Sequence, residues 1–264
     1  MESSAPPPLA VIAGGTSGIG FSVAARLMQD GYDVLITGRN TSRGEEASRK
    51  LKALHAEGEA AFLALESSDW HAYGRLVDAL ASRPVSTVVA SAAFGMQAHV
   101  IDTPTEAFHE MLAVNVAAPL HLVKTLRPHL SSHASIILIS SDAGIDGEQA
   151  LGAYSVTKAA VNMLGRMLAL DLAPEGVRVN VVCPGDTVPG MRYLLRPGET
   201  ERSREDYLAW PIPPRGRLGK PEDTAEFVAF LASPKADFMV GTVTLVDGGS
   251  RAGRPDAPQA ARWG

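Results

Sequence analysis

The sequence predicts an α/β fold in which helices cover both faces of a parallel sheet. Seven short apolar runs rich in β-branched residues alternate with segments of helical periodicity. The runs are continuously apolar, which is typical of strands buried on both faces. A chain of 264 residues with 45% hydrophobic residues can bury the core of one such domain.

The seven apolar runs define the expected strands in order. They are LAVIA at 9–13, DVLIT at 33–37, AAFLAL at 60–65, VSTVVAS at 85–91, ASIILIS at 134–140, VRVNVVC at 177–183 and TVTLV at 242–246. Turn residues or helical patterns separate each run from the next. This alternation predicts right-handed βαβ units that place the strands parallel.

Helical patterns fill most of the intervals between these strands. They fit residues 18–30, 41–57, 69–82, 105–127, 150–173 and 221–232. In the first of them Ile19, Val23 and Leu27 recur at four-residue spacing, and Gly31 follows as a helix stop. We expect each helix to place such an apolar stripe against the sheet.

Three segments fall outside this regular pattern. Residues 1–8 are expected to form a flexible N-terminus, and residues 250–264 a loose C-terminal tail. Residues 186–216 are rich in Pro and Arg and show no sustained period, which indicates a functional insertion such as a substrate lid. The catalytic domain is therefore expected to span residues 9–249.

Composition points to a small-molecule ligand. The net charge is -5, and the basic residues are scattered, which argues against nucleic acid as a partner. The N-terminus has no basic region followed by a long apolar run, so neither a signal peptide nor a membrane span is expected. The single cysteine fits a reducing compartment, by default the cytoplasm. No metal site is expected, because His129 and His133 have no third ligand nearby in the sequence.

A glycine-rich turn, GGTSGIG at residues 14–20, follows the first expected strand. Such a turn can point backbone N–H groups at a diphosphate, and the helix N-terminus adds partial positive charge. Gly14 would permit the turn, Gly18 the approach of the ligand, and Gly20 the packing of the helix against the sheet. The spacing differs from G-x-G-x-x-G. The alternative interpretation is that these glycines only form the turn between a strand and a helix, without a ligand.

The end of the second strand bears on cofactor choice. An NAD site would place an acidic residue near this point to bind the ribose 2′-hydroxyl, whereas this chain has Gly38 and Arg39. A guanidinium can bind a 2′-phosphate through charge-assisted hydrogen bonds. The residues predict a preference for NADP(H), with NAD(H) possible; a solvated loop arginine is the alternative.

A serine, a tyrosine and a lysine form the expected reactive centre. Tyr154 and Lys158 are four residues apart on one helix, and Ser141 follows the fifth strand at the carboxyl edge of the sheet. A carbonyl that receives hydride needs a proton donor, and a neighbouring ammonium is expected to lower the pKa of the phenol. Ser141 would donate a hydrogen bond to the oxygen on which charge develops.

Together these motifs resemble the short-chain dehydrogenase/reductase family, in particular its 3-oxoacyl-reductase-like branch. The resemblance covers residues 9–249 and includes GGTSGIG, ISS, YSVTK, CPGDT at 183–187 and the RLGKPEDTAEFVAFLAS…VDGG segment. It implies a single-domain, Rossmann-like, doubly wound seven-stranded parallel sheet in the order 3-2-1-4-5-6-7 with helices on both faces. It also implies that the helices near 105–127 and 150–173 pack across a homo-oligomer interface, usually a tetramer and sometimes a dimer.

The resemblance implies a role for each site residue. Tyr154 would be the general acid/base, Lys158 would lower its pKa and bind the nicotinamide ribose, Ser141 would orient the substrate, and Asn115 would support a water-linked proton relay. The implied cofactor contacts are Gly14, Thr16, Ser17, Gly18, Ile19, Gly20, Arg39, Glu66, Ser67, Ala90, Ala92, Asn115, Tyr154, Lys158, Pro184, Gly185 and Thr187.

Two positions depart from the family pattern. ASAA at 90–93 replaces the usual Asn-Asn-Ala-Gly, so the side-chain amides that brace the cofactor floor are missing, and Glu66 replaces an aspartate. The function expected is hydride transfer between NADP(H) and a carbonyl or secondary alcohol. The alternatives are an NAD-dependent alcohol dehydrogenase of the same family and a non-catalytic nucleotide-binding regulator.

Overall fold

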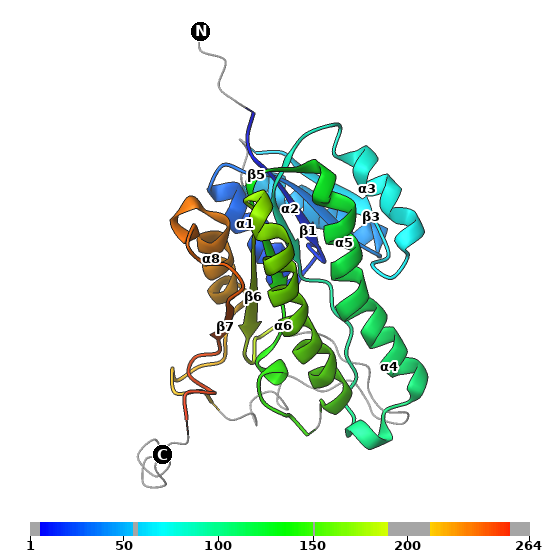
Figure 1. The fold of residues 1–264 in the computed structure, drawn as a ribbon, viewed down its shortest axis with the longest axis vertical. Helices are drawn as coiled ribbons and strands as arrows, with labels where there is room; N and C mark the ends of the chain where they lie inside the picture. The colour runs from blue at the N-terminus through cyan, green and yellow to red at the C-terminus, as the bar shows by residue number, and fades with distance from the viewer. Residues whose placement is uncertain (1–5, 55–57, 150, 190–211, 254–264) are drawn as a thin grey trace.

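One parallel sheet of seven strands organises the protein (Figure 1). The computed structural model describes residues 6–54, 58–149, 151–189 and 212–253. The strands are β1 Leu9–Ala13, β2 Asp33–Gly38, β3 Ala60–Ala64, β4 Val85–Ala90, β5 Leu130–Ile139, β6 Arg178–Pro184 and β7 Val243–Val246. Their order is β3-β2-β1-β4-β5-β6-β7, and every pairing is parallel, which confirms the predicted fold class.

Seven α-helices of the described chain connect or cover these strands. They are α1 Gly18–Gln29, α2 Thr41–Leu54, α3 Gly74–Ala79, α4 Thr105–Leu112, α5 Ala118–Leu126, α6 Gly152–Leu172 and α8 Pro221–Ala232. Shorter turns include η1 Trp70–Tyr73, the π-helix η3 Ala113–Ala117 and η5 Asp142–Gly144.

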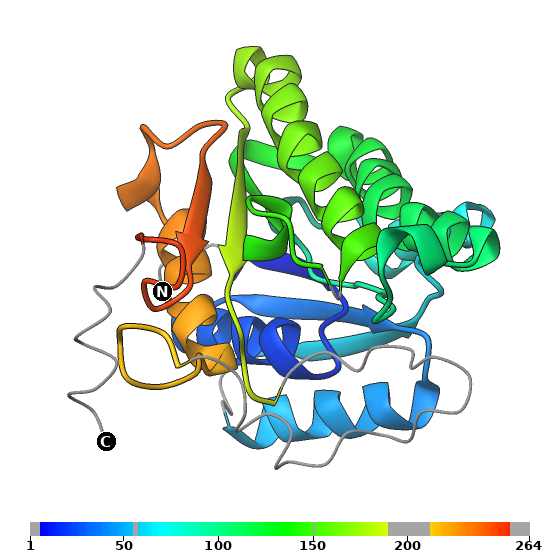
Figure 2. The same cartoon turned by 90° about the horizontal axis from the view of Figure 1, so that it is seen from below.

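The helices form two layers, one on each face of the sheet (Figure 2). On one face α3, α5 and α6 bury a core that includes Leu76, Leu122 and Val161. On the other face α1, α2 and α8 bury a second core. The strands contribute to both cores because alternate side chains point to opposite faces, so apolar residues fill consecutive strand positions.

The predicted helix over 105–127 is divided by one turn of π-helix. Helix α4 ends at Leu112, and α5 begins at Ala118 after the π-helical residues Ala113–Ala117. Pro119 lacks the N–H that a regular α-helix would donate to the carbonyl of Asn115, so an uninterrupted α-helical ladder cannot form here. The sequence pattern reported a helix correctly but not this local change in its hydrogen bonding.

The central strands end together at one edge of the sheet. Ala13 of β1 is paired with Ala90 of β4, and Ala90 is paired with Leu138 of β5. Strand β1 leads to α1 on one face, whereas β4 leads towards α4 and α5 on the other, so the chain diverges between these strands (Figures 1 and 2). Such a divergence opens a crevice at the carboxyl edge of the sheet, where ligands bind in open α/β folds.

Candidate active site

The glycine-rich turn packs too tightly for larger residues at two positions. Gly14 has a φ of +80°, and a Cβ atom there would lie 2.5 Å from the backbone nitrogen of Ala92. A Cβ on Gly20 would lie 2.3 Å from the carbonyl oxygen of Gly14. This glycine therefore lets α1 pack against the preceding glycine turn, and not against the sheet as the sequence suggested. Gly18 has a φ of +54° and no atom within 4 Å of the equivalent point.

These features fit a dinucleotide diphosphate. The first N–H groups of α1 have no partners within the helix, and its first turn contains no acidic residue. The partial positive charge at this helix end is therefore not neutralised locally, and the open space at Gly18 lies directly beside it. Thr16, Ser17 and Ile19 belong to the same turn.

The ends of β2 and β3 lie next to the glycine turn, where the resemblance to the family implies the adenosine side of the cofactor. A Cβ on Gly38 would lie 2.7 Å from the methyl group of Thr16, so the glycine lets the turn cross the end of β2. Arg39 follows and is exposed, while Glu66 and Ser67 are partly buried after the neighbouring β3. These three residues therefore lie beside the glycine turn on adjacent strand ends, and Arg39 can reach a phosphate in solvent.

Contacts with β1, the glycine turn and Asn115 hold the ASAA segment in place. The backbone N–H of Ser91 donates to the carbonyl of Ala13 at 2.8 Å, and Ala92 packs on Gly14. Farther along, Asn115 donates to the carbonyl of Phe94 and accepts from its N–H, both at 2.8 Å. The segment after β4 is thus fixed at both ends without the amide side chains common in the family.

Ser141, Tyr154 and Lys158 converge as the sequence predicted. Helix α6 begins beside the end of β5, and it presents Tyr154 and Lys158 from successive turns. The Lys158 ammonium lies 5.5 Å from the centre of the Tyr154 ring, and Nζ donates to the carbonyl of Ile139 at 2.9 Å. The side chains of Ser141 and Tyr154 are hydrogen bonded to each other. The hydrogen bond to Ile139 places Lys158 against the end of β5, two residues before Ser141.

Burial sets the protonation of this centre. It raises the pKa of Tyr154 well above its ordinary value, although the hydrogen bond with Ser141 acts in the opposite direction. Burial also lowers the pKa of Lys158 from 10.5 to about 8. Burial is the largest influence on the pKa of Tyr154 in this structure and raises it, so the lowering expected from Lys158 is not seen here.

Asn115 lies in the π-helix and is completely buried. Besides its two bonds to Phe94, its Nδ2 donates to Oγ1 of Thr157 at 2.9 Å, and Thr157 donates to the carbonyl of Tyr154 at 2.8 Å. Thr157 was missed by sequence reasoning, since a threonine inside a helical pattern gives no sign of its partners. Its hydroxyl connects the π-helix directly to the turn of α6 that carries Tyr154.

The end of β6 supplies the other wall of the crevice. Pro184 is its last residue, and a Cβ on Gly185 would lie 2.9 Å from Cα of Asp247, so this glycine admits the segment after β7. The Thr187 hydroxyl donates to the carbonyl of Gly185 at 2.9 Å. Most of the predicted lid at 186–216 lies outside the described residues, which omit 190–211.

Arg251 reaches the site from the C-terminal segment that the sequence indicated as a loose tail. Its guanidinium contacts Asp142 at 3.4 Å, Asp146 at 3.6 Å and Glu148 at 3.9 Å, all in the loop that joins β5 to α6. Asp142 in turn accepts a hydrogen bond from the Ser141 hydroxyl at 3.1 Å. No periodicity or spacing signals a contact between positions so distant in the chain.

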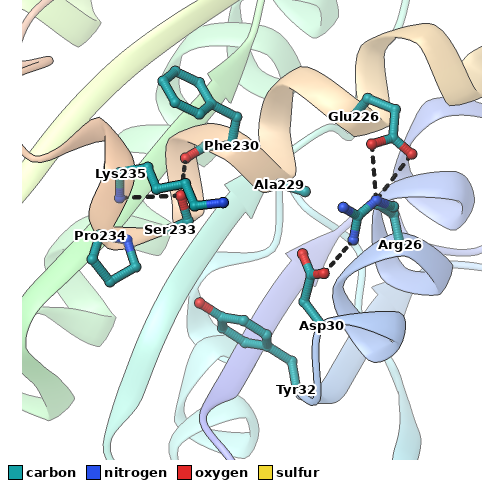
Figure 3. Close-up of a pocket in the computed structure, with 9 residues that line it drawn as sticks. All are labelled: Arg26, Asp30, Tyr32, Glu226, Ala229, Phe230, Ser233, Pro234 and Lys235. Carbon is teal, nitrogen blue, oxygen red and sulfur yellow. Dashed lines mark hydrogen bonds and ion pairs between the residues drawn. The ribbon is translucent and has the colours of Figure 1, made fainter.

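A separate pocket lies near the opposite edge of the sheet, between the ends of α1 and α8 (Figure 3). Its lining includes Arg26, which is paired with Asp30 and Glu226, together with Tyr32 and Lys235. None of the predicted site residues lines it. Its charged groups largely neutralise one another, and we assign it no catalytic role.

Comparison with known proteins agrees with the geometry. The family model described as Enoyl-(Acyl carrier protein) reductase matches residues 13–251. An NADP-dependent (R)-specific alcohol dehydrogenase of Lentilactobacillus kefiri is 33% identical over 250 residues, covering 91% of this chain and 95% of the relative. The chain belongs to the short-chain dehydrogenase/reductase family. Its members are NAD(P)-dependent oxidoreductases, so the enzyme class predicted from the sequence is confirmed.

Solved structures of the family share the fold. A short-chain type dehydrogenase/reductase from Mycobacterium ulcerans is 28% identical with a TM-score of 0.81, and covers 96% of this chain and 93% of its own. The L-sorbose reductase of Gluconobacter frateurii, solved with NADPH and L-sorbose, has a TM-score of 0.83 at 24% identity, with 96% and 100% covered. Among the helices described for this family member, none has the length and hydropathy needed to cross a membrane.

Proposed function

We propose that the protein is an NADP(H)-dependent oxidoreductase that interconverts a carbonyl group and a secondary alcohol, with Tyr154 as general acid/base. The observation that carries this proposal is the convergence of Tyr154, Ser141 and Lys158 at the carboxyl edge of the sheet. When bound in the crevice, NADPH supplies a hydride to the carbonyl carbon. The residues of the chain then have to complete the reaction at the carbonyl oxygen.

Tyr154 suits the role of proton donor to that oxygen. Burial raises its pKa, so the phenol keeps its proton near neutral pH and can release it as negative charge develops on the substrate. Ser141 is hydrogen bonded to Tyr154 and donates its own proton to Asp142, so a substrate oxygen that replaces Asp142 as acceptor would lie beside the phenol. This arrangement favours reduction as the direction in which the site is prepared.

Lys158 supplies the positive charge of the site. With a pKa of about 8, the ammonium remains mostly charged at pH 7, and its bond to Ile139 holds it in place. A buried cation beside Tyr154 stabilises the phenolate left after proton transfer. Asn115 and Thr157 secure the backbone of Tyr154, and they support the proposed proton relay by fixing its geometry.

The preference for NADP(H) rests on Arg39. It is exposed at the end of β2, beside the glycine turn, and no carboxylate occupies its position. The Lentilactobacillus kefiri relative is NADP-dependent, which supports the same choice. Changing Arg39→Asp should reverse the ratio of kcat/KM for NADPH and NADH, whereas Arg75→Asp on α3 should leave it unchanged. An unaltered ratio in the Arg39 variant would refute the assignment.

Changing Tyr154→Phe tests the catalytic assignment most directly. We expect kcat to fall by about 10² to 10⁴, the usual contribution of a general acid, while NADPH affinity measured by fluorescence titration is retained. Tyr32→Phe, in the pocket of Figure 3, is the matched control and should keep full activity. Full activity in the Tyr154 variant would overturn the mechanism. Binding of NADPH without turnover across a broad panel of carbonyls would favour a nucleotide-binding regulator.

We further propose that the protein acts as a homo-oligomer, a tetramer or a dimer, in the cytoplasm. Helix α6 exposes 53% of Met163, 49% of Met167 and 70% of Leu170, at spacings that place them on one helical face. Such an apolar face is typical of a subunit interface. Light scattering coupled to gel filtration should show an oligomer that Leu170→Glu dissociates; a monomeric parent protein would contradict this.

A further inference from the structure

Three carboxylates face one guanidinium beside the reactive centre. Asp142, Asp146 and Glu148 belong to the loop between β5 and α6, and each contacts Arg251 at 3.4 to 3.9 Å. Three carboxylates against one guanidinium give the group a net negative charge when they are ionised, and burial raises the pKa of Asp142 and of Glu148. These carboxylates adjoin the site that Ser141, Tyr154 and Lys158 define. No separate glycosidase, metal or phosphate site is needed to account for them.

The negative charge acts at the reacting atoms. The carboxylate of Asp142 is buried and accepts a hydrogen bond from Ser141 at 3.1 Å. A substrate oxygen that took the place of Asp142 as acceptor from Ser141 would lie within roughly 6 Å of this carboxylate, the sum of two hydrogen-bond lengths. Asp142 and Glu148 also contribute to raising the pKa of Tyr154, so both charges are felt at the phenol.

One guanidinium offsets only part of the charge of three carboxylates. Its contacts are longer than good hydrogen bonds, and within the described chain its buried Nε has no hydrogen-bond acceptor. Its position is set by the backbone, since its N–H donates to the Asp247 carboxylate at 2.8 Å. Asp186 adds a fourth carboxylate, and burial raises its pKa to about 6, which still leaves it mostly ionised above pH 7.

We propose that Asp142, Asp146 and Glu148 determine substrate specificity by charge. They exclude carbonyl substrates that carry a carboxylate or phosphate close to the reacting carbon, and they admit neutral or ammonium-bearing ones. This selection rests on the proposed reductase function, because it requires the carbonyl to bind beside Ser141 and Tyr154. If Arg251 instead anchored an anionic substrate, the same kinetic measurements would give a different set of results.

The test compares three substrates of one skeleton with the full-length enzyme and saturating NADPH at pH 7.5. Ethyl acetoacetate is neutral, acetoacetate is anionic, and 4-amino-2-butanone is cationic. We expect kcat/KM for the neutral and cationic ketones to exceed that for acetoacetate at least tenfold. The ratio should shrink as salt rises, because screening weakens charge discrimination at a solvent-accessible site.

Variants identify the source of the discrimination. The double change Asp146→Asn and Glu148→Gln removes charge without touching Ser141, and should reduce the neutral-to-anion ratio at least threefold. Arg251→Met should increase it. Glu226→Gln removes one carboxylate from the distant pocket of Figure 3 and serves as the matched control, with an unchanged ratio. NADPH titration of each variant establishes that the cofactor site is intact.

Two results would overturn the inference, and they are distinguishable from failure of the proposed function. Equal kcat/KM for the three ketones would show that the carboxylates do not select by charge. Preferred turnover of acetoacetate that Arg251→Met abolishes would assign Arg251 as an anion anchor instead. Lack of turnover with all three ketones and with the broad panel of carbonyls would refute the reductase proposal itself, and the charge selection would fall with it.

Discussion

Replacing Lys158 with methionine should make the protein more stable at neutral pH while it removes activity. Lys158 is 2% exposed and its Nζ donates to Ile139, so a methionine of similar length fills the same space without a charge. Burial of the ammonium lowers its pKa from 10.5 to about 8. The folded state therefore binds the proton less tightly than the unfolded state does.

The size and sign of the effect follow from these pKa values. At about 1.4 kcal/mol for each pH unit, holding Lys158 charged in the fold costs about 3 kcal/mol at pH 7. Loss of the hydrogen bond to Ile139 offsets about 1 to 2 kcal/mol of the gain. This cost falls as pH rises from about 8 towards 10.5, because Lys158 then becomes neutral in the unfolded state as well. Lys158→Met should thus be more stable than the parent by about 1 to 2 kcal/mol at pH 7, and no more stable at pH 10.

Urea unfolding at the two pH values provides the assay. The difference in free energy of unfolding between parent and variant should change by about 2 to 3 kcal/mol from pH 7 to pH 10. The contributions of the other titrating groups are the same in both proteins and cancel. Lys124→Met, on the exposed side of α5, is the matched control and should show no such change. An equal difference in free energy of unfolding between the Lys158 variant and its parent at pH 7 and pH 10 would refute this prediction.

Three further outcomes are expected. A Cβ on Gly144 would lie 2.6 Å from the carbonyl carbon of Lys158, so Gly144→Ala should lower kcat at least tenfold, whereas Gly147→Ala, with no atom within 4 Å, should not; similar losses in both would contradict this. Thr157→Val leaves Asn115 without one acceptor and should lower kcat about tenfold, with Thr157→Ser retaining activity as the check on the hydroxyl. Steady-state kcat/KM for reduction should decline above about pH 8 as Lys158 loses its proton, and a profile that stays flat to pH 10 would argue against its role as a cation.

The order of the elements could be read from the sequence because burial dictates it. Strands covered on both faces need continuous apolar runs, and the helices between them need one apolar stripe, so both patterns are local. Strand β1 was expected at 9–13 and found there. The π-helix at Ala113–Ala117 was not foreseen, because one added residue per turn barely changes an apolar pattern.

The residue types of the site could be predicted from the sequence, whereas the direction of the pKa shift of Tyr154 could not. Tyr154 and Lys158 are neighbours through helix geometry alone, which a spacing of four residues reveals. The direction of the Tyr154 pKa depends on how completely α6 and the β5 loop exclude water, and that is a property of the whole fold. The contact between Arg251 and Asp142 joins distant parts of the chain and has no local signature.

The anchoring of Lys158 has a consequence for how the family can diversify. Its ammonium is bonded to Ile139, and Ser140 is bonded back to its carbonyl at 3.0 Å, so chemistry and core packing occupy the same contacts. Asp146, by contrast, is exposed in a turn. Mutations at such turn positions leave the folded core intact, and evolution can therefore vary what enters the crevice while the reacting groups stay fixed.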